Sequence, residues 1–315
     1  MRVLFAGTPE VALPTLQALM NHPEHELVGV LTRADARKGR GRALHASPVA
    51  ALAREAGLDV HTPATLRDES ARIWVRTLDA DVAVVVAYGR LIPAALLDIP
   101  KHGWLNLHFS LLPAWRGAAP VQRALIAGDT TTGASVFRLE EGMDTGPVYA
   151  RLTEAIRPTD TSDDLLTRLA EAGAPLVLDV LRTLNRGTAA PEPQAEEGVT
   201  VAPMLTSADG EIHWADPAPA IDCRVRGVTP APGAHTLYDG ARLRLGPVAV
   251  VPEVADLPPG RLRVTKHEVL VGTGDCAVRL GQVAPAGKKW MAAEAWARGA
   301  RPPVGAVLGV QGREL

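Results

Sequence analysis

Cysteine is scarce in this sequence, which has only Cys223 and Cys276 among 315 residues. The two lie far apart, and neither belongs to a CxxC motif or a cluster of histidines and cysteines. The spacing excludes a disulfide-rich scaffold and gives no support to cysteine-based metal or redox chemistry. We expect two reduced thiols in a cytoplasmic protein that holds no metal.

Long hydrophobic runs are also missing. The longest unbroken aliphatic run is Val82–Ala87, far below the ~18 residues that indicate a membrane span. The N-terminal apolar run Val3–Ala6 is shorter than the roughly 7–15-residue core of a secretion signal. These two absences predict a soluble, cytoplasmic protein.

The usual nucleotide fingerprints are absent after the first apolar segment. Residues 6–10 read Ala-Gly-Thr-Pro-Glu, which is neither a GxGxxG sequence nor a phosphate loop ending in GKS or GKT. The Gly-rich fingerprints work by bringing backbone amides close to phosphates, and this loop lacks their glycine spacing. NAD or ATP binding therefore has little support.

What is present is an ordinary globular composition, with 47% hydrophobic and 22% charged residues. At about 150 residues per domain, the length favours two domains. A net charge of −2 gives no reason to expect general polyanion binding, so any nucleic-acid contact depends on local basic patches. Residues 33–42 form one, with five basic residues against one acid. A solvated surface loop explains the same composition, and both interpretations stay open.

The first half of the chain alternates short apolar runs with helical patterns. We expect strands over residues 2–7, 27–32, 59–62, 81–87 and 103–108. Helices are expected over 47–56 and from Thr8–Glu10 onward, where Thr8 is the expected cap. The continuous Val and Ala run at 81–87 is typical of a parallel sheet covered on both faces. The pattern predicts a doubly wound, Rossmann-like α/β domain over residues 1–186, with its site at the carboxyl ends of the strands.

A helix is expected at 163–186, and after it the composition and the hydrophobic pattern change. Residues 187–205 are rich in Ala, Pro and Glu without periodicity, as in a linker. Beyond them, short alternating segments at 241–245, 261–264, 268–271 and 277–280 are separated by Gly and Pro. This predicts a smaller β-barrel domain of the OB-like kind over residues 206–315.

Three polar residues stand where chemistry is expected. Asn106 and His108 are two apart on a predicted strand, so their side chains share one face at its carboxyl end. Asp144 lies between Gly142 and Gly146 in Glu-Gly-Met-Asp-Thr-Gly. Taken singly, these residues are more often explained as a polar pair at a sheet end and as a turn aspartate. Together, an amide, an imidazole and a carboxylate without a Ser or Cys nucleophile favour direct acyl transfer.

Four motifs carry a resemblance that covers nearly the whole chain. They are AGTPE at 6–10, NLHFSLLPAWRGAAP at 106–120, EGMDTG at 141–146 and PAGKK at 285–289. The chain resembles the methionyl-tRNA formyltransferases within the wider 10-formyltetrahydrofolate-dependent formyltransferase family. The central motifs are shared by the wider family and point to the formyl donor and the reaction. The first motif, the basic insertion, RGAAP and the added C-terminal domain point to the acceptor.

The resemblance implies a catalytic set of Asn106, His108 and Asp144. Asn106 and His108 would donate hydrogen bonds to the oxyanion that forms as an amine attacks the formyl carbon. Asp144 would orient His108 and raise its pKa, and could take or relay the proton of the amine. No covalent intermediate and no metal is implied.

The resemblance also implies where the substrates bind. The donor 10-formyltetrahydrofolate would lie against residues of two loops, namely Val86, Ala87, Tyr88, Leu91, Ser110, Leu111, Leu112 and Pro113. The acceptor, methionyl-initiator tRNA, would contact Arg37, Lys38, Arg40 and Arg42, together with the domain over 206–315. We expect a monomer.

Two other interpretations stay open. One is formyl transfer to a small amine, such as an amino sugar nucleotide or glycinamide ribonucleotide, which would require neither the basic loop nor the second domain. The other is a non-catalytic RNA-binding protein built on the same fold. Three residues depart from the family pattern: Phe109 replaces a usual Gly, Met204 a common Lys and Ala231 a usual Trp.

Overall fold

The computed structural model describes residues 1–38 and 43–309. The chain divides into two units, which are described separately. Unit 1 comprises residues 1–120, 131–155 and 166–202, and unit 2 comprises residues 121–130, 156–165 and 203–315. Arg40 and Arg42 of the predicted tRNA-binding set lie outside the described residues.

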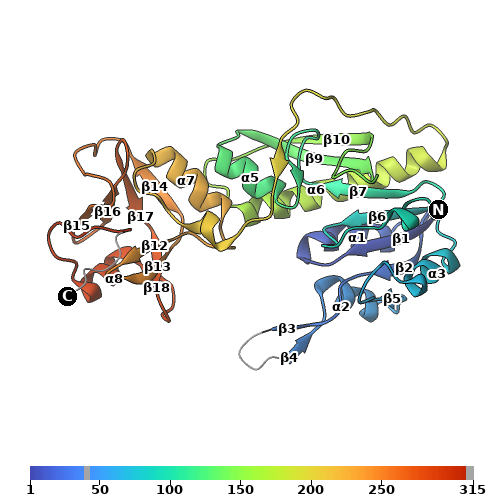
Figure 1. Ribbon diagram of the computed structural model, residues 1–315, viewed down its shortest axis with the longest axis horizontal. Helices are drawn as coiled ribbons and strands as arrows, with labels where there is room; N and C mark the ends of the chain where they lie inside the picture. Colours follow the sequence, from blue (N-terminus) through green and yellow to red (C-terminus); the bar gives the residue numbers. More distant parts are fainter. Residues whose placement is uncertain (39–42, 310–315) are drawn as a thin grey trace. The chain divides into compact units, whose positions relative to one another are not determined.

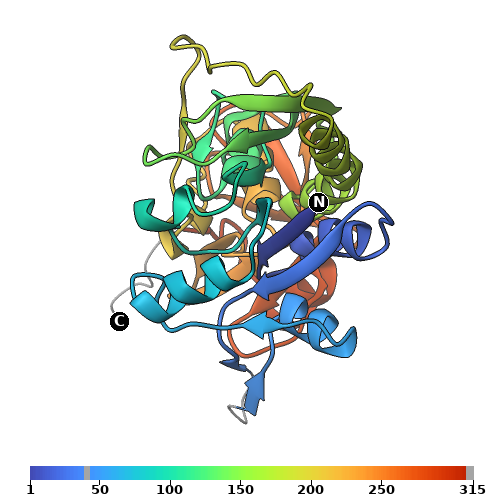
Figure 2. The same cartoon turned by 90° about the vertical axis from the view of Figure 1, so that its right-hand side faces the viewer.

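Unit 1 is built on a seven-stranded sheet in the order β10-β9-β7-β6-β1-β2-β5. Five of its strands are parallel, and in Figure 2 β1 and β2 run side by side in blue. The strands are β1 (Arg2–Gly7), β2 (Glu26–Leu31), β5 (Val60–His61), β6 (Val82–Val86), β7 (Trp104–His108), β9 (Thr131–Arg138) and β10 (Val148–Ala155). The predicted α/β class is confirmed, and each predicted strand is present within about two residues of its expected ends.

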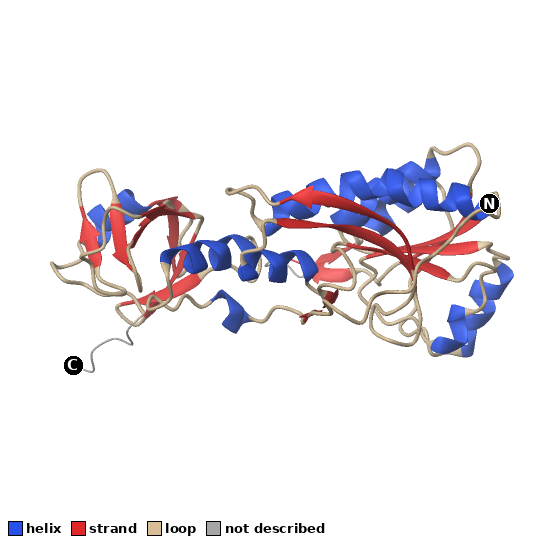
Figure 3. Ribbon diagram, turned by 90° about the horizontal axis from the view of Figure 1, so that it is seen from above, coloured by secondary structure: helices blue, strands red, loops and turns tan. Residues whose placement is uncertain are grey.

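Helices cover both faces of this sheet (Figure 3). On one face, Ala71 and Val75 of α3 and Leu96 of α4 share a core with strand residues such as Leu4 and Val85. On the other face, α6 packs so closely over β7 that a Cβ on Gly173 would lie 2.7 Å from Leu107. The helices are α1 (Leu13–Met20), α2 (Pro48–Glu55), α3 (Glu69–Thr77), α4 (Ala94–Leu97) and α6 (Ser162–Asn185), the last of which begins in unit 2.

The helix starts show how local sequence sets the elements. Ser47 caps α2, because its Oγ accepts a hydrogen bond from the amide of Ala50 at 3.0 Å. The expected cap at Thr8 is wrong. Thr8 instead donates its hydroxyl to the carbonyl of Tyr88 at 2.8 Å, and a 3-10 turn at Glu10–Ala12 precedes α1.

Several strands were not predicted from the sequence. β9 and β10 extend the parallel sheet with antiparallel pairs. Two more pairs lie outside the main sheet: β3 (Ala36–Lys38) with β4 (Ala43–His45), and β8 (Arg116–Gly117) with β11 (Val201–Ala202). Arg37 and Lys38 therefore lie on a strand of a small hairpin, which Figure 1 labels as β3 and β4.

Unit 2 contains two four-stranded antiparallel sheets, in the orders β12-β13-β18-β19 and β14-β17-β16-β15. The strands are β12 (His235–Tyr238), β13 (Ala241–Leu245), β14 (Val248–Val251), β15 (Leu262–Val264), β16 (Val269–Gly272), β17 (Ala277–Leu280), β18 (Gln282–Pro285) and β19 (Met291–Ala292). The helices are α5 (Pro120–Ala127), α7 (Ala218–Gly227) and α8 (Ala293–Ala300), with a 3-10 turn at Ser207–Gly210.

The two sheets of unit 2 are halves of one bent ribbon. β13 pairs with β18 and β14 pairs with β17, and the chain passes between the sheets at Gly246–Pro247 and at Gly281. The amide of Gly246 donates to the carbonyl of Gln282 at 2.8 Å, which keeps the pairing through the bend. The bend lets side chains from both sheets pack into one core. Leu243 of β13 and Val278 of β17 are two of them.

No helix within the described residues is both long enough and apolar enough to cross a membrane.

Gly133 on β9 gives a test of the sheet. A Cβ there would lie 2.0 Å from the carbonyl oxygen of Leu152 and 2.6 Å from the side chain of Leu111. We expect Gly133→Ala to lower the free energy of unfolding by about 1–3 kcal/mol, the usual cost of overpacking. Gly299→Ala in α8 is the matched control, because its Cβ would meet nothing within 4 Å. Denaturant unfolding that gives equal stability for both variants would contradict the close approach at Gly133.

Candidate active site

β7 places two of the three predicted catalytic residues. Trp104, Asn106 and His108 alternate along the strand and so face the same side of the sheet. Trp104 is fully buried beneath α4, and its Nε1 donates to the carbonyl of Leu96 at 2.7 Å. Asn106 is partly exposed, and its amide has no hydrogen bond to another described residue. The carboxyl end of the strand therefore presents a free amide beside a buried imidazole.

Both ring nitrogens of His108 face oxygen atoms. Nε2 lies 2.8 Å from the carbonyl oxygen of Trp115, and Nδ1 lies 3.7 Å from Oδ2 of Asp144. A carbonyl can only accept, so Nε2 carries the proton and the neutral ring has none on Nδ1. The distance of 3.7 Å is longer than a hydrogen bond, as expected when Nδ1 is unprotonated. The structure thus brings His108 and Asp144 together as the sequence predicted.

Asp144 is held by its backbone and by its carboxylate. Its φ of +52° lies in the left-handed region, and Oδ2 accepts a hydrogen bond from the amide of Gly117 at 2.7 Å. The neighbouring Gly146 has no room for a side chain, because a Cβ would lie 1.8 Å from the carbonyl oxygen of Arg138. Aspartate is among the few residues that tolerate this backbone conformation. The glycines therefore set the path of the loop, and the Gly117 amide fixes the carboxylate.

Burial sets the pKa of His108. The side chain is 6% exposed, and this desolvation lowers the pKa below the ordinary value of 6.5. Asp144 and the Trp115 carbonyl act in the opposite direction but do not compensate. The expectation that Asp144 raises the pKa of His108 above its ordinary value is therefore wrong, because burial outweighs the carboxylate. At neutral pH the ring is uncharged and donates from Nε2.

The loop after β7 is held by hydroxyl groups. Ser110 donates from Oγ to the carbonyl of Ala114 at 2.6 Å. Ser135 on β9 donates to the carbonyl of Ser110 at 2.7 Å and accepts from the amide of Leu112 at 3.1 Å. Gly117 ends the loop at a φ of +128°, where a Cβ would lie 2.6 Å from the carbonyl oxygen of Ala202. These bonds place the Trp115 carbonyl against His108 and the Gly117 amide against Asp144.

A second set of bonds holds the loop of Asp144 and was not found from the sequence. Gln194 donates from Nε2 to the carbonyls of Asp144 and Gly146 at 2.7 and 2.8 Å. Its Oε1 accepts from Nε and Nη2 of Arg116 at 3.0 and 2.7 Å. Gln194 lies in the segment interpreted as a linker, where a lone Gln among Pro, Ala and Glu gave no signal. Through Gln194, that segment contacts the loops that carry Arg116 and Asp144.

The residues predicted to bind folate lie on the loops after β6 and β7. Val86 and Tyr88 are buried, whereas Leu91 is 77% exposed. Ala87 has a φ of +48°, which turns the chain sharply at the end of β6. In the second loop, Ser110 and Leu112 are buried, Leu111 packs against Gly133, and Pro113 follows Leu112. Ser110 and Leu112 therefore shape the loop, and direct contact with folate stays a prediction.

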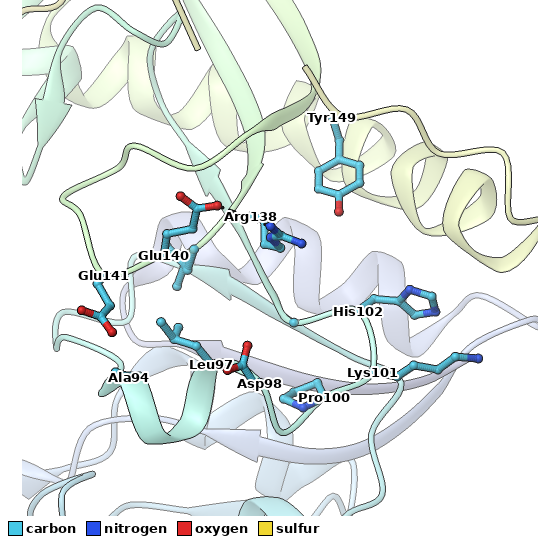
Figure 4. Close-up of a pocket in the computed structure, with 12 residues that line it drawn as sticks. Ala94, Leu97, Asp98, Pro100, Lys101, His102, Arg138, Glu140, Glu141 and Tyr149 are labelled. Carbon is cyan, nitrogen blue, oxygen red and sulfur yellow. Dashed lines mark hydrogen bonds and ion pairs between the residues drawn. The ribbon is translucent and has the colours of Figure 1, made fainter. Parts of the chain in front are cut away.

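A hollow of about 570 Å³ opens at the amino end of β7. In Figure 4, Glu140 and Glu141 lie on one side and Lys101 and His102 on the other. Its lining includes neither His108 nor any residue of the two predicted folate loops. This hollow is therefore separate from the proposed reaction centre.

The three departures from the family pattern have different surroundings. Phe109 is buried, directly after His108. Met204 is 73% exposed, and its carbonyl accepts a long hydrogen bond from Arg123 at 3.5 Å. Ala231 lies on the exposed turn between α7 and β12. None of the three side chains makes a hydrogen bond or ion pair.

Two family models match the chain. The formyl transferase family matches residues 1–181, and its C-terminal domain family matches residues 204–301. The chain belongs to the formyl transferase family.

Among the relatives is a methionyl-tRNA formyltransferase of Salinispora tropica, 56% identical over 98% of this chain and 100% of the relative. A solved N-formyltransferase of Helicobacter canadensis, in complex with folinic acid and dTDP-3-aminofucose, has a TM-score of 0.69 at 15% identity and covers 89% of this chain and 98% of that one. HypX of Aquifex aeolicus, in complex with tetrahydrofolic acid, has a TM-score of 0.67 at 18% identity. That match covers 96% of this chain, which spans 48% of the length of HypX.

A titration tests the charge state of His108. We expect its NMR midpoint to lie below pH 6.5, because burial lowers the pKa. In Asp144→Asn the midpoint should fall further, since one of the two interactions that raise it is lost. The His108→Gln spectrum assigns the resonance. A midpoint above pH 6.5, or an upward shift in Asp144→Asn, would contradict the burial argument.

The same shift fixes the sign of a stability effect. Between the lowered pKa and 6.5 the unfolded chain binds more protons at this site than the folded one. The contribution of His108 to the free energy of unfolding is therefore full above pH 6.5 and is lost as the pH falls through that window.

Gln194 gives a test of how Asp144 is positioned. Gln194→Ala should lower kcat about 10-fold with little change in KM, because a small displacement of the carboxylate costs rate more than binding. Glu196→Ala is the matched control, two residues away and exposed, without a hydrogen bond to another described residue. The His108 titration midpoint should also move in Gln194→Ala and not in the control. Equal kcat and KM values in both variants would show that Gln194 does not position Asp144.

Proposed function

We propose that this chain transfers the formyl group of 10-formyltetrahydrofolate to the α-amino group of methionyl-initiator tRNA. The observation that carries the proposal is the cluster of Asn106, His108 and Asp144 at the carboxyl end of β7, with His108 and Asp144 3.7 Å apart. Relatives that share more than half of the sequence bear the name of this activity.

The chemistry needs no covalent intermediate with the protein. The amine nitrogen attacks the formyl carbon, a tetrahedral centre forms, and the bond from that carbon to N10 of the folate breaks. The amine loses a proton, N10 gains one, and tetrahydrofolate leaves. Asn106 and the Nε2–H of His108 donate to the oxyanion of the tetrahedral centre, a kind of interaction whose loss typically costs about 10²–10³ in rate.

The contacts of His108 give an order to this step. Its Nε2 is held by the Trp115 carbonyl at 2.8 Å. On our proposal the formyl oxygen takes the place of that carbonyl, because a donor aimed at the transition state has to be free of its resting partner. Asp144 then faces the unprotonated Nδ1 and takes up the proton of the amine. A neutral His108 suits this division, since one group donates and the other accepts.

The remaining assignments concern the substrates. We propose that the donor lies between the loops that carry Val86–Leu91 and Ser110–Pro113. The tRNA phosphates would contact Arg37, Lys38, Arg40 and Arg42, with further tRNA contacts on the domain over residues 206–315. We also propose catalytic and C-terminal domains with the predicted bounds 1–186 and 206–315, and a monomer that acts in the cytoplasm.

Formyl transfer in solution tests the function. The full-length protein is incubated with labelled 10-formyltetrahydrofolate and, in parallel, with methionyl-initiator tRNA, uncharged tRNA, an amino sugar nucleotide or glycinamide ribonucleotide. Label should appear only on the charged tRNA. His108→Ala and Asn106→Ala should each lower kcat at least about 10²-fold while the KM for the donor stays nearly constant.

The two substitutions should also be non-additive, because both residues serve one oxyanion. Labelling of a small amine in place of the tRNA would replace the proposed acceptor. Labelling of none, with tightly bound tRNA, would favour a binding protein without this activity.

A further inference from the structure

Trp290 is an exposed aromatic residue of unit 2 that lies beside the positively charged Arg244. Arg244 on β13 pairs with Ala284 on β18, and Val283 pairs with Met291 on β19. Extending that register by one residue places Trp290 beside Ala284. Because Val283 faces the core, Ala284 faces the outer side of the sheet, as do Arg244 and Trp290.

Arg244 and Trp290 meet above Ala284. The guanidinium carbon of Arg244 lies 4.9 Å from the centre of the Trp290 ring, within the range of a cation–π contact. Ala284 is fully buried although it faces outward, because its small side chain lets the two larger ones close over it. Trp290 nevertheless stays 45% exposed. The result is a fixed aromatic plane that is only partly covered.

A cavity of about 300 Å³ adjoins this plane within unit 2. Trp290, Arg244 and Gln282 line one part of it, and the turn after α7, with Pro230 and Pro232, lines another. The proline rings are rigid and apolar, and the amide of Gln282 can both donate and accept. The volume is at the lower end of the range for small-ligand sites, about 300–1,000 Å³, so it suits a flat group the size of one nucleobase.

The charge around the cavity has one sign. Arg244 is the only charged residue in its lining, and no carboxylate is among the lining residues. Lys288 and Lys289 are exposed and directly precede Trp290. None of these three cations forms an ion pair with a carboxylate in the described part of the chain. An aromatic plane, an arginine and unpaired lysines together fit a base with its attached phosphates.

We propose that this cavity, the Trp290 pocket, receives one unpaired nucleobase of the tRNA. The base stacks on the Trp290–Arg244 pair between the proline walls, and Lys288 and Lys289 neutralise the adjoining phosphates. The inference rests on the proposed function, because it names a contact of the same acceptor. A proline-rich peptide is the other occupant that an aromatic pocket could hold, but it would leave the three cations without partners.

Binding of uncharged initiator tRNA to the full-length protein tests the pocket without any formyl donor. Trp290→Ala should raise the Kd roughly 10-fold, the effect expected when one stacked base is lost. Trp290→Phe should stay within a few-fold of the wild type, because it keeps a stacking face. Val264→Ala removes part of another exposed apolar side chain of unit 2, 42% exposed, and should change nothing.

Salt dependence separates stacking from phosphate contact. Stacking releases no counterions, so Trp290→Ala should raise the Kd by the same factor at each salt concentration. Lys289→Ala should reduce the slope of log Kd against log salt concentration by about one. In formyl transfer, Trp290→Ala should raise the KM for methionyl-tRNA and leave kcat unchanged.

Two results would overturn the proposal: an unchanged tRNA Kd in Trp290→Ala, or a Trp290→Phe variant as weak as Trp290→Ala. If Trp290→Ala loses thermal stability, Trp290→Leu replaces it, since leucine keeps apolar volume without a stacking face. A wild type that binds tRNA through Trp290 yet formylates no methionyl-tRNA would refute the proposed function and leave the pocket standing.

Discussion

The hydrogen bond from the Gly117 amide to the Asp144 carboxylate is the contact on which the candidate active site depends. At 2.7 Å it joins the loop after β7 to the loop after β9, and both loops bear on His108. The Trp115 carbonyl approaches the ring from the first loop, and Asp144 approaches it from the second. Gln194 supports the same junction, because it bonds Arg116 on the first loop and the carbonyl of Asp144 on the second.

Burial and charge act against each other at His108. A carboxylate beside a histidine normally favours the imidazolium, but here desolvation is the larger effect. Desolvation thus keeps the imidazole neutral. A neutral ring has one N–H donor and no positive charge to offset the carboxylate of Asp144. Two groups with separate tasks are thereby kept within 3.7 Å of each other. A fully exposed pair with the same separation would titrate as an ordinary ion pair.

Much of this fold could be predicted because the signals are local. The strands at 2–7 and 241–245 match the observed elements residue for residue, since apolar alternation and flanking turns define them. The Asn-x-His spacing likewise followed from the two-residue period of a strand. β9 and β10 escaped prediction because their pairing partners, not their composition, make them strands. The antiparallel edge of the sheet is a property of the tertiary structure.

The proximity of His108 and Asp144 was predictable, but the net shift of the pKa of His108 was not. Asp144 was singled out by its glycine neighbours, and it raises the pKa of His108 as predicted. Burial, which was not predicted, lowers that pKa by more than Asp144 raises it. Burial depends on how many layers cover a side chain, and no spacing in the sequence encodes that number. Gln194 was missed for a related reason. Its two hydrogen bonds to backbone carbonyls join positions about fifty residues apart, which no local pattern records.

The position of Gln194 also bears on how this protein can be divided or recombined. After Gln194 the chain forms β11 against β8, and the last segment of unit 2 begins only at residue 203. A fragment that ended at residue 186 would keep Asn106, His108 and Asp144 and lose Gln194, which holds the loop of Asp144. The part of the chain that supports the candidate site therefore extends beyond residue 186. An exchange of C-terminal domains between relatives has its natural junction after Ala202.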